Sequence, residues 1–443
     1  MTQNPKRKRL LINVLIITIL ALGTIVAVQF AKGYRPDIKN RQIQGTGLLS
    51  ATSYPKAARV IINDKLTTVT DDKLYLTPGN YTIKIEKDGF HAWTKSTPIK
   101  SELVTSIDAR LFPIISATAP ITFYQASNPS INPDGTKIAY VLQNSPVDTD
   151  NGLYVYSLTN NLLGSQNIQI TSGTKDYSNA TLIWSPDSSQ ILAIFTEKST
   201  PTKSNPKVTE KIISAQQLST KSLNQAKNIT DVTFRLPLII SEWQDQYAKI
   251  NLPTLALYPK YMSDILSQKS VNVYFSPDKE RVFYTPIENI NLPENDIAKT
   301  LPNVNSSPES RNLIKDQTYI FDLKEGTNYL INQASRQTDV AKSIIVASQA
   351  TPSANLDALK QLKAQNDSRF TTNLSWYGSR QLILSNADGV NIVDYDGLNT
   401  INITAATVKS NFIVPSPDGS KLVILTNINQ KADTFNLISF DLK

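Results

Sequence analysis

The sequence predicts an all-β extracytoplasmic region, a small β-sandwich followed by a β-propeller of five or six blades, behind one N-terminal transmembrane helix. Three observations predict this fold class: a long uncharged apolar run near the N-terminus, short alternating apolar runs after it, and a turn motif that recurs beyond residue 113. The expected organisation is a basic cytoplasmic tail (1–9), a helix (10–30), a stalk (31–45), a sandwich (46–113) and a propeller (114–443).

The first expected element is a membrane-spanning helix from Leu10 to Phe30, a run without any charged side chain. At about 1.5 Å per residue it spans roughly 30 Å, the thickness of a bilayer's hydrocarbon core. Lys6-Arg7-Lys8-Arg9 directly precedes it, and basic residues stay on the cytoplasmic side. The run is too long for a typical signal-peptide core, and no cleavage site follows it cleanly. We therefore expect an uncleaved anchor rather than a buried helix of a soluble domain.

The net charge of +8 arises almost entirely around that helix. Residues 1–41 contain eight basic side chains and one acidic side chain, which leaves 37 basic and 36 acidic groups in the rest of the chain. A nucleic-acid-binding protein normally gathers positive charge on one face. We therefore expect no nucleic-acid partner. The expected partner of residues 10–30 is the lipid bilayer, whose anionic lipids the basic flanks can also contact.

Several chemistries are excluded by the residue types that the chain lacks. It has no Cys, which excludes disulfides, thiolate chemistry and Cys-ligated metal sites, and only one His. A multi-histidine metal site would need more histidines than His91 alone, and His91 is the one residue that could serve as the base of a Ser-His-Asp triad. No P-loop, G-x-G-x-x-G or G-x-S-x-G motif is present. We assign no catalytic, cofactor-binding or metal-ligating residue, expect no cofactor, and expect a protein that is not an enzyme.

The stalk, residues 31–45, is polar and has no hydrophobic period. After Gly47, short alternating runs predict strands at 59–63, 73–76, 81–85, 90–99 and 103–111. Thr77-Pro78-Gly79-Asn80 lies between the second and third of these runs. Pro followed by Gly suits a type II turn, so the sequence predicts a tight hairpin there.

Four separated motifs in residues 46–113 resemble a PEGA domain. Gly47-Leu48-Leu49-Ser50 and residues 54–60 resemble its opening, and residues 76–81 and 87–90 match its L-x-P-G-x-Y and K-x-G-[FY] signatures. The chain departs from the family at Ala57, where the name motif has glycine. The resemblance implies a small β-sandwich of bacterial and archaeal surfaces, to which no catalysis is attributed.

A second motif recurs through the propeller. Its copies are Asn132-Pro133-Asp134-Gly135, Ser185-Pro186-Asp187-Ser188, Ser276-Pro277-Asp278-Lys279, the decayed Ser375-Trp376-Tyr377-Gly378, and Ser416-Pro417-Asp418-Gly419. Alternating strand patterns follow each copy, and such modules at a period of roughly 40–50 residues are typical of propeller blades. The copies resemble the WD40-like repeats of TolB-type propellers. We expect their Ser and Asp side chains to bond the turn backbone.

The last module ends at Lys443 after its third strand, while residues 121–125 form a spare strand before the first module. We expect this spare strand to complete the last blade and to close the ring. Insertions are expected at about 232–271 and 336–372, the second with an amphipathic helix at 355–362. Residues 287–315 are expected to form a loop. The insertions leave the number of blades at five or six.

Two polar groups could carry chemistry, and each also has a structural interpretation. Residues 148–152 hint at a calcium loop, but the glycine spacing favours a polar loop. Asp388, Asp394 and Asp396 could serve glycoside hydrolysis as paired carboxylates. Asp-Gly pairs are also typical of hairpin turns, which is the interpretation we favour.

The aromatic residues and the lone histidine also have two interpretations. Trp93, Trp184, Trp243 and Trp376 could stack on sugars, but the equivalent positions of Trp184 and Trp376 in their modules favour core packing. His91 has no ligand partners in the sequence and is expected at the surface or partly packed.

The expected function is that of a membrane-anchored extracytoplasmic binding or scaffold protein of the cell surface. Its propeller would recognise a protein or an envelope polysaccharide. The alternative is a carboxylate-dependent propeller hydrolase or lyase acting on surface carbohydrate. A signalling role is disfavoured, because only nine residues precede the helix. The expected location is the cell membrane, single-pass, with the N-terminus cytoplasmic and the C-terminal domains extracytoplasmic. Fold class alone does not decide among these functions.

Overall fold

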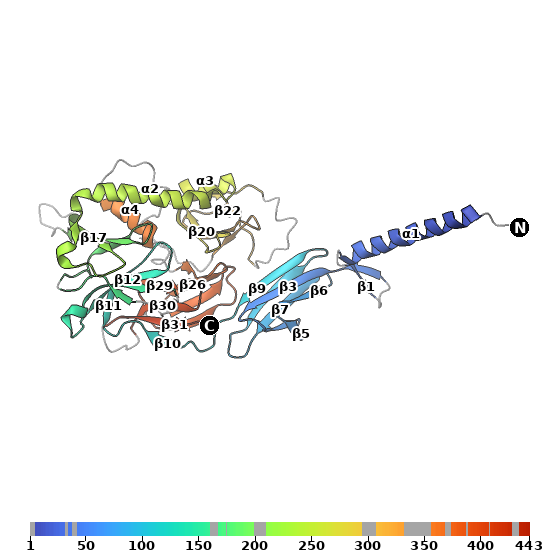
Figure 1. Ribbon diagram of the computed structural model, residues 1–443, viewed down its shortest axis with the longest axis horizontal. Helices are drawn as coiled ribbons and strands as arrows, with labels where there is room; N and C mark the ends of the chain where they lie inside the picture. The colour runs from blue at the N-terminus through green and yellow to red at the C-terminus, as the bar shows by residue number, and fades with distance from the viewer. Residues whose placement is uncertain are drawn as a thin grey trace. The chain divides into compact units, whose positions relative to one another are not determined.

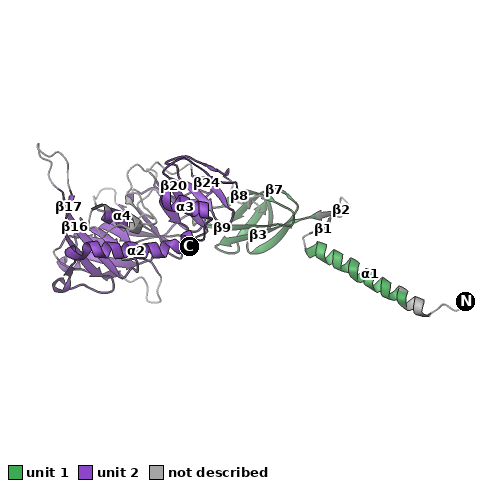
Figure 2. Cartoon of the chain, turned by 90° about the horizontal axis from the view of Figure 1, so that it is seen from above, with its two compact units in different colours: residues 1–114, 296–306 green, residues 115–295, 307–443 purple. Residues whose placement is uncertain are grey.

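The computed structural model in Figure 1 describes residues 5–31, 34–37, 42–159, 167–173, 175–198, 210–294, 307–331, 356–367, 374–386, 389–406, 408–427 and 434–443. The chain forms two compact units, one comprising residues 1–114 with 296–306 and the other 115–295 with 307–443 (Figure 2).

The N-terminal helix, α1, runs from Pro5 to Ala31 and confirms the helix predicted at 10–30. Its segment Ile12–Ala31 is long and apolar enough to cross a membrane, and its apolar side chains are exposed. Two hydroxyls inside the helix donate to carbonyls one turn earlier, Thr18 to Val14 and Thr24 to Leu20. Such bonds satisfy polar groups that lipid would leave unpaired.

Two short strands follow α1 where the sequence predicted an irregular stalk. Strand β1 (Tyr34–Asp37) pairs antiparallel with β2 (Gln42–Gly45). The Tyr34 hydroxyl donates to a Glu102 carboxylate oxygen at 2.6 Å.

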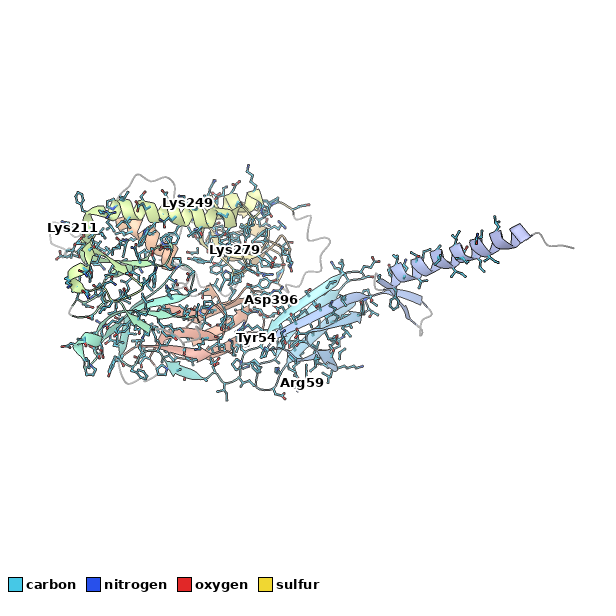
Figure 3. All side chains as sticks on the ribbon, in the orientation of Figure 1. Tyr54, Arg59, Lys211, Lys249, Lys279 and Asp396 are labelled. Atoms are coloured by element: carbon cyan, nitrogen blue, oxygen red, sulfur yellow. The ribbon has the colours of Figure 1, made fainter. Side chains whose placement is uncertain are left out.

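A seven-stranded sandwich completes the first unit. Its strands are β3 (Gly47–Tyr54), β4 (Arg59–Ile62), β5 (Lys65–Val69), β6 (Asp72–Leu76), β7 (Gly79–Glu86), β8 (Trp93–Ile99) and β9 (Val104–Arg110). One sheet has the order β6-β3-β9, with β3 and β9 parallel, and the other β5-β4-β7-β8. The core between the sheets contains Leu49, Val60, Ile83, Ile85 and Ile107, all at most 1% exposed. Arg59 is paired with Glu86 and Asp88 on the surface (Figure 3).

The predicted hairpin at residues 77–80 is wrong. Strand β6 pairs with β3, whereas β7 pairs with β4 and β8, so the chain crosses here from one sheet to the other. Gly79 does not adopt a positive φ, which a type II turn would require at that position. Instead, the Tyr81 hydroxyl donates to the Thr77 carbonyl and fixes the corner.

Ala57 adopts a φ of +56°, in the left-handed region. This is the position at which the family motif has glycine. An L-residue in that conformation costs roughly 1–2 kcal/mol, whereas glycine has no such penalty. The departure from the motif therefore leaves local strain and does not change the fold.

The described part of the second unit contains five four-stranded antiparallel sheets, the blades of a propeller. Blade 1 contains β11 (Gln125–Ile131), β12 (Lys137–Gln143), β13 (Gly152–Ser157) and β14 (Asn167–Gln169), and blade 2 contains β15 (Thr181–Trp184), β16 (Gln190–Lys198), β17 (Glu210–Ser219) and β18 (Thr230–Asp231). Blade 3 contains β19 (Ser270–Phe275), β20 (Arg281–Pro286), β23 (Tyr319–Asp322) and β24 (Thr327–Leu330), and blade 4 contains β25 (Leu374–Trp376), β26 (Gln381–Asn386), β27 (Gly389–Asp394) and β28 (Ile401–Thr404). Blade 5 contains β29 (Val408–Pro415), β30 (Lys421–Thr426), β31 (Asn436–Asp441) and, from upstream, β10 (Thr118–Pro120).

The closing strand lies earlier than the sequence predicted. Residues 118–120, not 121–125, pair with β31. The Ile121 and Thr122 amides both donate to the Leu437 carbonyl, which ends the pairing. The chain then bends toward blade 1, and Gln125 already begins β11. The sequence predicted that a strand before blade 1 completes blade 5, but not which residues of that strand pair with β31.

The three Ser-Pro-Asp copies of the recurring turn are stabilised by their own side chains. In blade 2 the Ser185 hydroxyl donates to Asp187 at 2.6 Å and accepts from the Gln190 amide at 3.0 Å. Ser276 and Ser416 make the same pair of bonds in blades 3 and 5. The motif is therefore structural.

Among the described residues, helices cover one face of blade 2 and one face of blade 3, on which no blade packs. Blade 1 packs against blades 2 and 5, and blade 3 packs against blade 4. Between blades 2 and 3 lie α2 (Leu236–Leu255), α3 (Lys260–Gln268) and α4 (Leu356–Asp367). Helices α2 and α4 pack on blade 2, and the end of α2 with α3 packs on blade 3. Figure 1 shows α2 extending from the β17 side to the β20 side.

One hydrogen bond shows that these helices replace a blade. The Tyr377 hydroxyl of blade 4 donates to the Gly419 carbonyl in the turn of blade 5. The Tyr258 hydroxyl, between α2 and α3, donates at 2.9 Å to the carbonyl of Lys279 (Figure 3), the equivalent turn residue of blade 3. The helical segment thus makes the contact that a preceding blade would make. The insertion predicted at 232–271 is mainly helical in its described residues until β19 of blade 3 begins at Ser270. Those described residues contain no strand of a sixth blade.

Replacing Ala57 with Gly should stabilise the sandwich by about 0.5–1 kcal/mol, because the relief of left-handed strain exceeds the added entropy of the unfolded chain. Slower hydrogen exchange of the buried β4 amides would show this. Ala92 is exposed with an ordinary φ, so Ala92→Gly should destabilise the sandwich. Equal effects at both positions would contradict the assignment.

The turn aspartates should make the propeller sensitive to acid. The hydrogen bond from Ser185 lowers the pKa of Asp187 below its usual value. A lowered folded-state pKa stabilises the fold above the unfolded value of about 3.9, and this contribution is lost as the pH falls. The urea midpoint, read by tryptophan fluorescence, should therefore fall between about pH 5 and pH 3. Asp187→Asn should flatten this dependence, and Asp264→Asn on the exposed side of α3 should not.

Candidate binding site on the propeller

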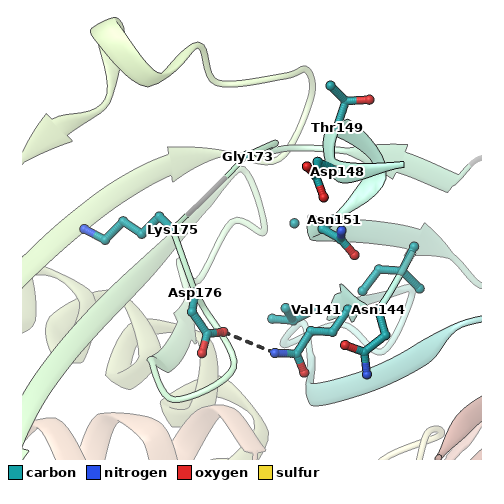
Figure 4. Close-up of a pocket in the computed structure, with 11 residues that line it drawn as sticks. Val141, Asn144, Asp148, Thr149, Asn151, Gly173, Lys175 and Asp176 are labelled. Carbon is teal, nitrogen blue, oxygen red and sulfur yellow. Dashed lines mark hydrogen bonds between the residues drawn. The ribbon is translucent and has the colours of Figure 1, made fainter. Parts of the chain in front are cut away.

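A pocket of about 430 Å³ opens beside blade 1 (Figure 4). Three segments line it: the end of β12, the loop from β12 to β13, and the loop that connects blade 1 to blade 2. Its apolar floor includes Val141, which is 2% exposed, and the partly buried Leu142. The loop residues around this floor are polar.

The β12–β13 loop has its own internal hydrogen bonds. It contains a short 3₁₀ helix, Asp148–Asp150. The Asn151 side chain accepts from the Ser145 amide at 2.9 Å and donates to the Ser145 carbonyl at 3.3 Å. The Tyr154 hydroxyl donates to the Asp150 carbonyl at 2.7 Å. These bonds fix the backbone of the loop.

Gly152 ends this loop and allows a close backbone approach. Its φ is +148°, and a Cβ there would lie 2.1 Å from the Thr171 carbonyl oxygen. Gly389 takes the same position in blade 4, where a Cβ would lie 1.9 Å from the Thr404 oxygen. Sequence reasoning missed this role. The signal was the pairing of a glycine at the start of one strand with Ile-x-Ile-Thr at the end of the next.

The loop that connects blade 1 to blade 2 forms one wall of the pocket, and its carboxylate already accepts hydrogen bonds within the protein. Asp176 accepts from the Ser178 amide and hydroxyl, both at 2.8 Å, and from the Gln143 amide at 3.4 Å (Figure 4). The Lys175 ammonium lies 4.1 Å from the centre of the Phe195 ring, and Figure 4 shows its side chain directed away from Asp176. This wall thus presents hydrogen-bond acceptors to the pocket, while the Lys175 ammonium lies over the Phe195 ring.

Asp148 is the available carboxylate of the pocket. Its side chain is exposed, and no described residue donates a hydrogen bond to it or forms an ion pair with it. Among the described residues, no group of three or more His, Cys, Asp or Glu side chains could hold a metal ion. The pocket therefore has the features of a binding site, with an apolar floor and an acceptor-rich rim.

The four tryptophans pack in the cores. Trp184 is 0% exposed, and Trp93, Trp243 and Trp376 are at most 9% exposed. The Trp376 indole donates to the Tyr274 carbonyl at 2.9 Å. None of these rings offers a face for sugar stacking.

Asp394 is the last residue of β27, and Asp396 (Figure 3) lies in the turn that follows. Asp394 accepts from the Gln381 and Asn399 side chains, and Asp396 accepts from the Leu398 amide. Asp388 lies outside the described residues. The partly buried His91 donates its backbone N–H to the Phe112 carbonyl. The turn interpretation therefore fits the two described aspartates.

A second group of charges is buried in blade 3. Arg281 and Asp322 form an ion pair at 2.7 Å, with the Asp322 side chain 0% exposed. Nearby, burial and then the charge of Asp322 raise the pKa of Glu325. The Tyr329 hydroxyl donates to Glu325 at 3.0 Å. Sequence reasoning did not identify this group, because Arg281 comes from β20 and the other members come from the β23–β24 hairpin.

Comparison with known protein families agrees with the PEGA resemblance. The family model of the PEGA domain matches residues 46–114, so this part of the chain is a PEGA domain. No curated protein matches the chain.

Solved structures that resemble the chain include two described as TolB. The TolB from Acinetobacter baumannii is 15% identical, with 82% of this chain and 60% of that chain covered and a TM-score of 0.20. The TolB of Agrobacterium tumefaciens is 13% identical, with 69% and 71% covered and a TM-score of 0.20. An oligogalacturonate lyase in complex with manganese is 9% identical, with 82% and 86% covered and a TM-score of 0.23. At such low TM-scores these likenesses indicate nothing about function, and the propeller fold rests on the strand pairing.

Gly152→Ala should destabilise the propeller by about 2 kcal/mol or more, because its methyl group would collide with the Thr171 carbonyl. Gly173→Ala is the matched control, since Gly173 also has a positive φ but nothing lies within 4 Å of its Cβ position. It should cost only about 1 kcal/mol of left-handed strain. Urea unfolding read by tryptophan fluorescence compares the two variants. Equal destabilisation would contradict the close approach.

Proposed function

We propose that this chain is a membrane-anchored binding or scaffold protein of the cell surface, whose propeller recognises a partner outside the cytoplasm. The observation that carries the proposal is the pocket beside blade 1, which combines an apolar floor with an accessible acceptor, Asp148. The surrounding side chains are committed to hydrogen bonds that fix the loops. A rigid pocket with few convergent polar groups is typical of a recognition site.

The proposed topology has the N-terminus in the cytoplasm and the PEGA domain and propeller outside. Helix α1 supplies the anchor, and the basic residues 6–9 at its start favour retention of that end inside. A PEGA domain at 46–114 agrees with an extracytoplasmic location. In this proposal α1 remains uncleaved.

The partner classes we propose are a protein or an envelope polysaccharide. The alternative function, a carboxylate-dependent hydrolase or lyase, would need an available acid. Glu325 has the raised pKa suited to a general acid, but Tyr329 and Thr327 donate hydrogen bonds to it. Its neighbour Asp322 is fully buried against Arg281. Both carboxylates thus have structural partners, which favours binding over catalysis.

Single cysteines test the proposed topology, because the chain has no cysteine of its own. In cells with an intact inner membrane, a membrane-impermeant maleimide should label Lys221→Cys, on an exposed propeller loop. It should label Thr2→Cys only after lysis. The reverse pattern would rule out a surface role.

The full-length chain in detergent should bind one class of ligand on protein and glycan arrays without turning it over. Product formation from a carbohydrate, lost in Glu325→Gln, would favour the enzymatic alternative. Binding without product, at equal strength in the wild type and Glu325→Gln, is the expected result.

A further inference from the structure

The pocket beside blade 1 has the shape and chemistry of a site for a long basic side chain. Its floor is apolar, with Val141 and Leu142, and its rim carries the carboxylates of Asp148 and Asp176. Arg and Lys side chains have the matching arrangement, an apolar stem that ends in a cationic head. We propose that the pocket binds an exposed arginine or lysine side chain of a partner protein. This rests on the proposed role of the propeller in recognition.

The distribution of charge in the pocket supports a cationic ligand. Three ionisable residues line it: Asp148, Asp176 and Lys175. The Lys175 ammonium is placed over the Phe195 ring and does not neutralise the rim. Asp148 has no partner among the described residues, so its carboxylate is free to accept from a guanidinium or an ammonium group. A charge-assisted hydrogen bond of this kind is about twice as strong as a neutral one.

The pocket also differs from a carbohydrate site. None of the residues that line it is aromatic, although a sugar ring normally packs its C–H face against an aromatic ring. Several amides on the rim are already used, those of Gln143 and Asn151 in bonds to Asp176 and to the Ser145 backbone. The remaining capacity is mainly for accepting hydrogen bonds, and this favours a donor-rich cation over a polysaccharide.

The size of the pocket fits the same ligand. A volume of about 430 Å³ accommodates one long side chain with its flanking backbone. Asp148 lies in a 3₁₀ turn fixed by Asn151 and Tyr154. The backbone that carries the acceptor is therefore held in place before the ligand arrives, and less conformational entropy is lost on binding.

Ligand-observed NMR on the full-length chain in detergent tests this inference with small probes. N-acetyl-arginine N-methylamide should receive saturation at its side-chain methylene protons. N-acetyl-norleucine N-methylamide, which lacks the charge, should bind at least about fivefold more weakly, as should the arginine probe to Asp148→Asn. Thr149→Arg should abolish binding by filling the pocket. Asp245→Asn, the same charge change on the exposed side of α2, should leave binding unchanged.

Three results would overturn the inference: equal binding of both probes, equal losses in Asp148→Asn and Asp245→Asn, or binding of chitotriose in place of the arginine probe. The last would assign the pocket to a polysaccharide. Thermal melting of each variant confirms that it is folded. The array experiment separates the two proposals. A partner that the wild type and Asp148→Asn capture equally leaves the recognition role intact and removes only the basic-side-chain site, whereas no partner at all removes the recognition role.

Discussion

The propeller depends on the pairing of β10 with β31. Blade 5 has only three strands of its own, and β10, from before blade 1, supplies the fourth. This pairing covers the outer edge of β31, which would otherwise be open to association with another chain. It also joins the beginning and the end of the propeller, since blades 1 and 5 share a core that includes Tyr140, Val414 and Val423. The loops that form the pocket are then held by a closed framework.

The second constraint is that each blade face must be covered. Ile183, Leu192 and Ile194 of blade 2 are at most 1% exposed, although no blade in the described part of the chain packs on that side. Trp243 and Tyr247 of α2 and Leu359 and Leu362 of α4 cover them. Exposing such a face would cost about 25 cal/mol for each Å² of apolar surface. The helices therefore take the place of a blade. Tyr258 donates to the turn of blade 3 as Tyr377 donates to the turn of blade 5.

Local signals in the sequence predicted much of this fold. The uncharged run identified α1, the PEGA motifs identified the sandwich, and the Ser-Pro-Asp turns identified the blades. Features that depend on which strands and helices pack together were not predicted. Pro78-Gly79 signals a reversal of the chain, but whether the next strand pairs within the same sheet depends on tertiary packing. The helix predicted at 355–362 overlaps α4, but its position against blade 2 was not predicted. The pocket combines Asp148 and Asp176 from different loops, so only the fold brings them together.

Closure of the ring by β10 is the central claim, and a disulfide tests it most directly. Ala119 and Ser439 are register partners in the β10–β31 pairing, and antiparallel partners lie about 4.5–5.5 Å apart between Cα atoms, within the range of a disulfide. Because the chain has no other cysteine, the double variant Ala119→Cys/Ser439→Cys can form only this bond within one molecule. The account predicts spontaneous cross-linking under oxidising conditions, seen as faster migration on a non-reducing gel. A folded double variant that retains two free thiols would contradict it.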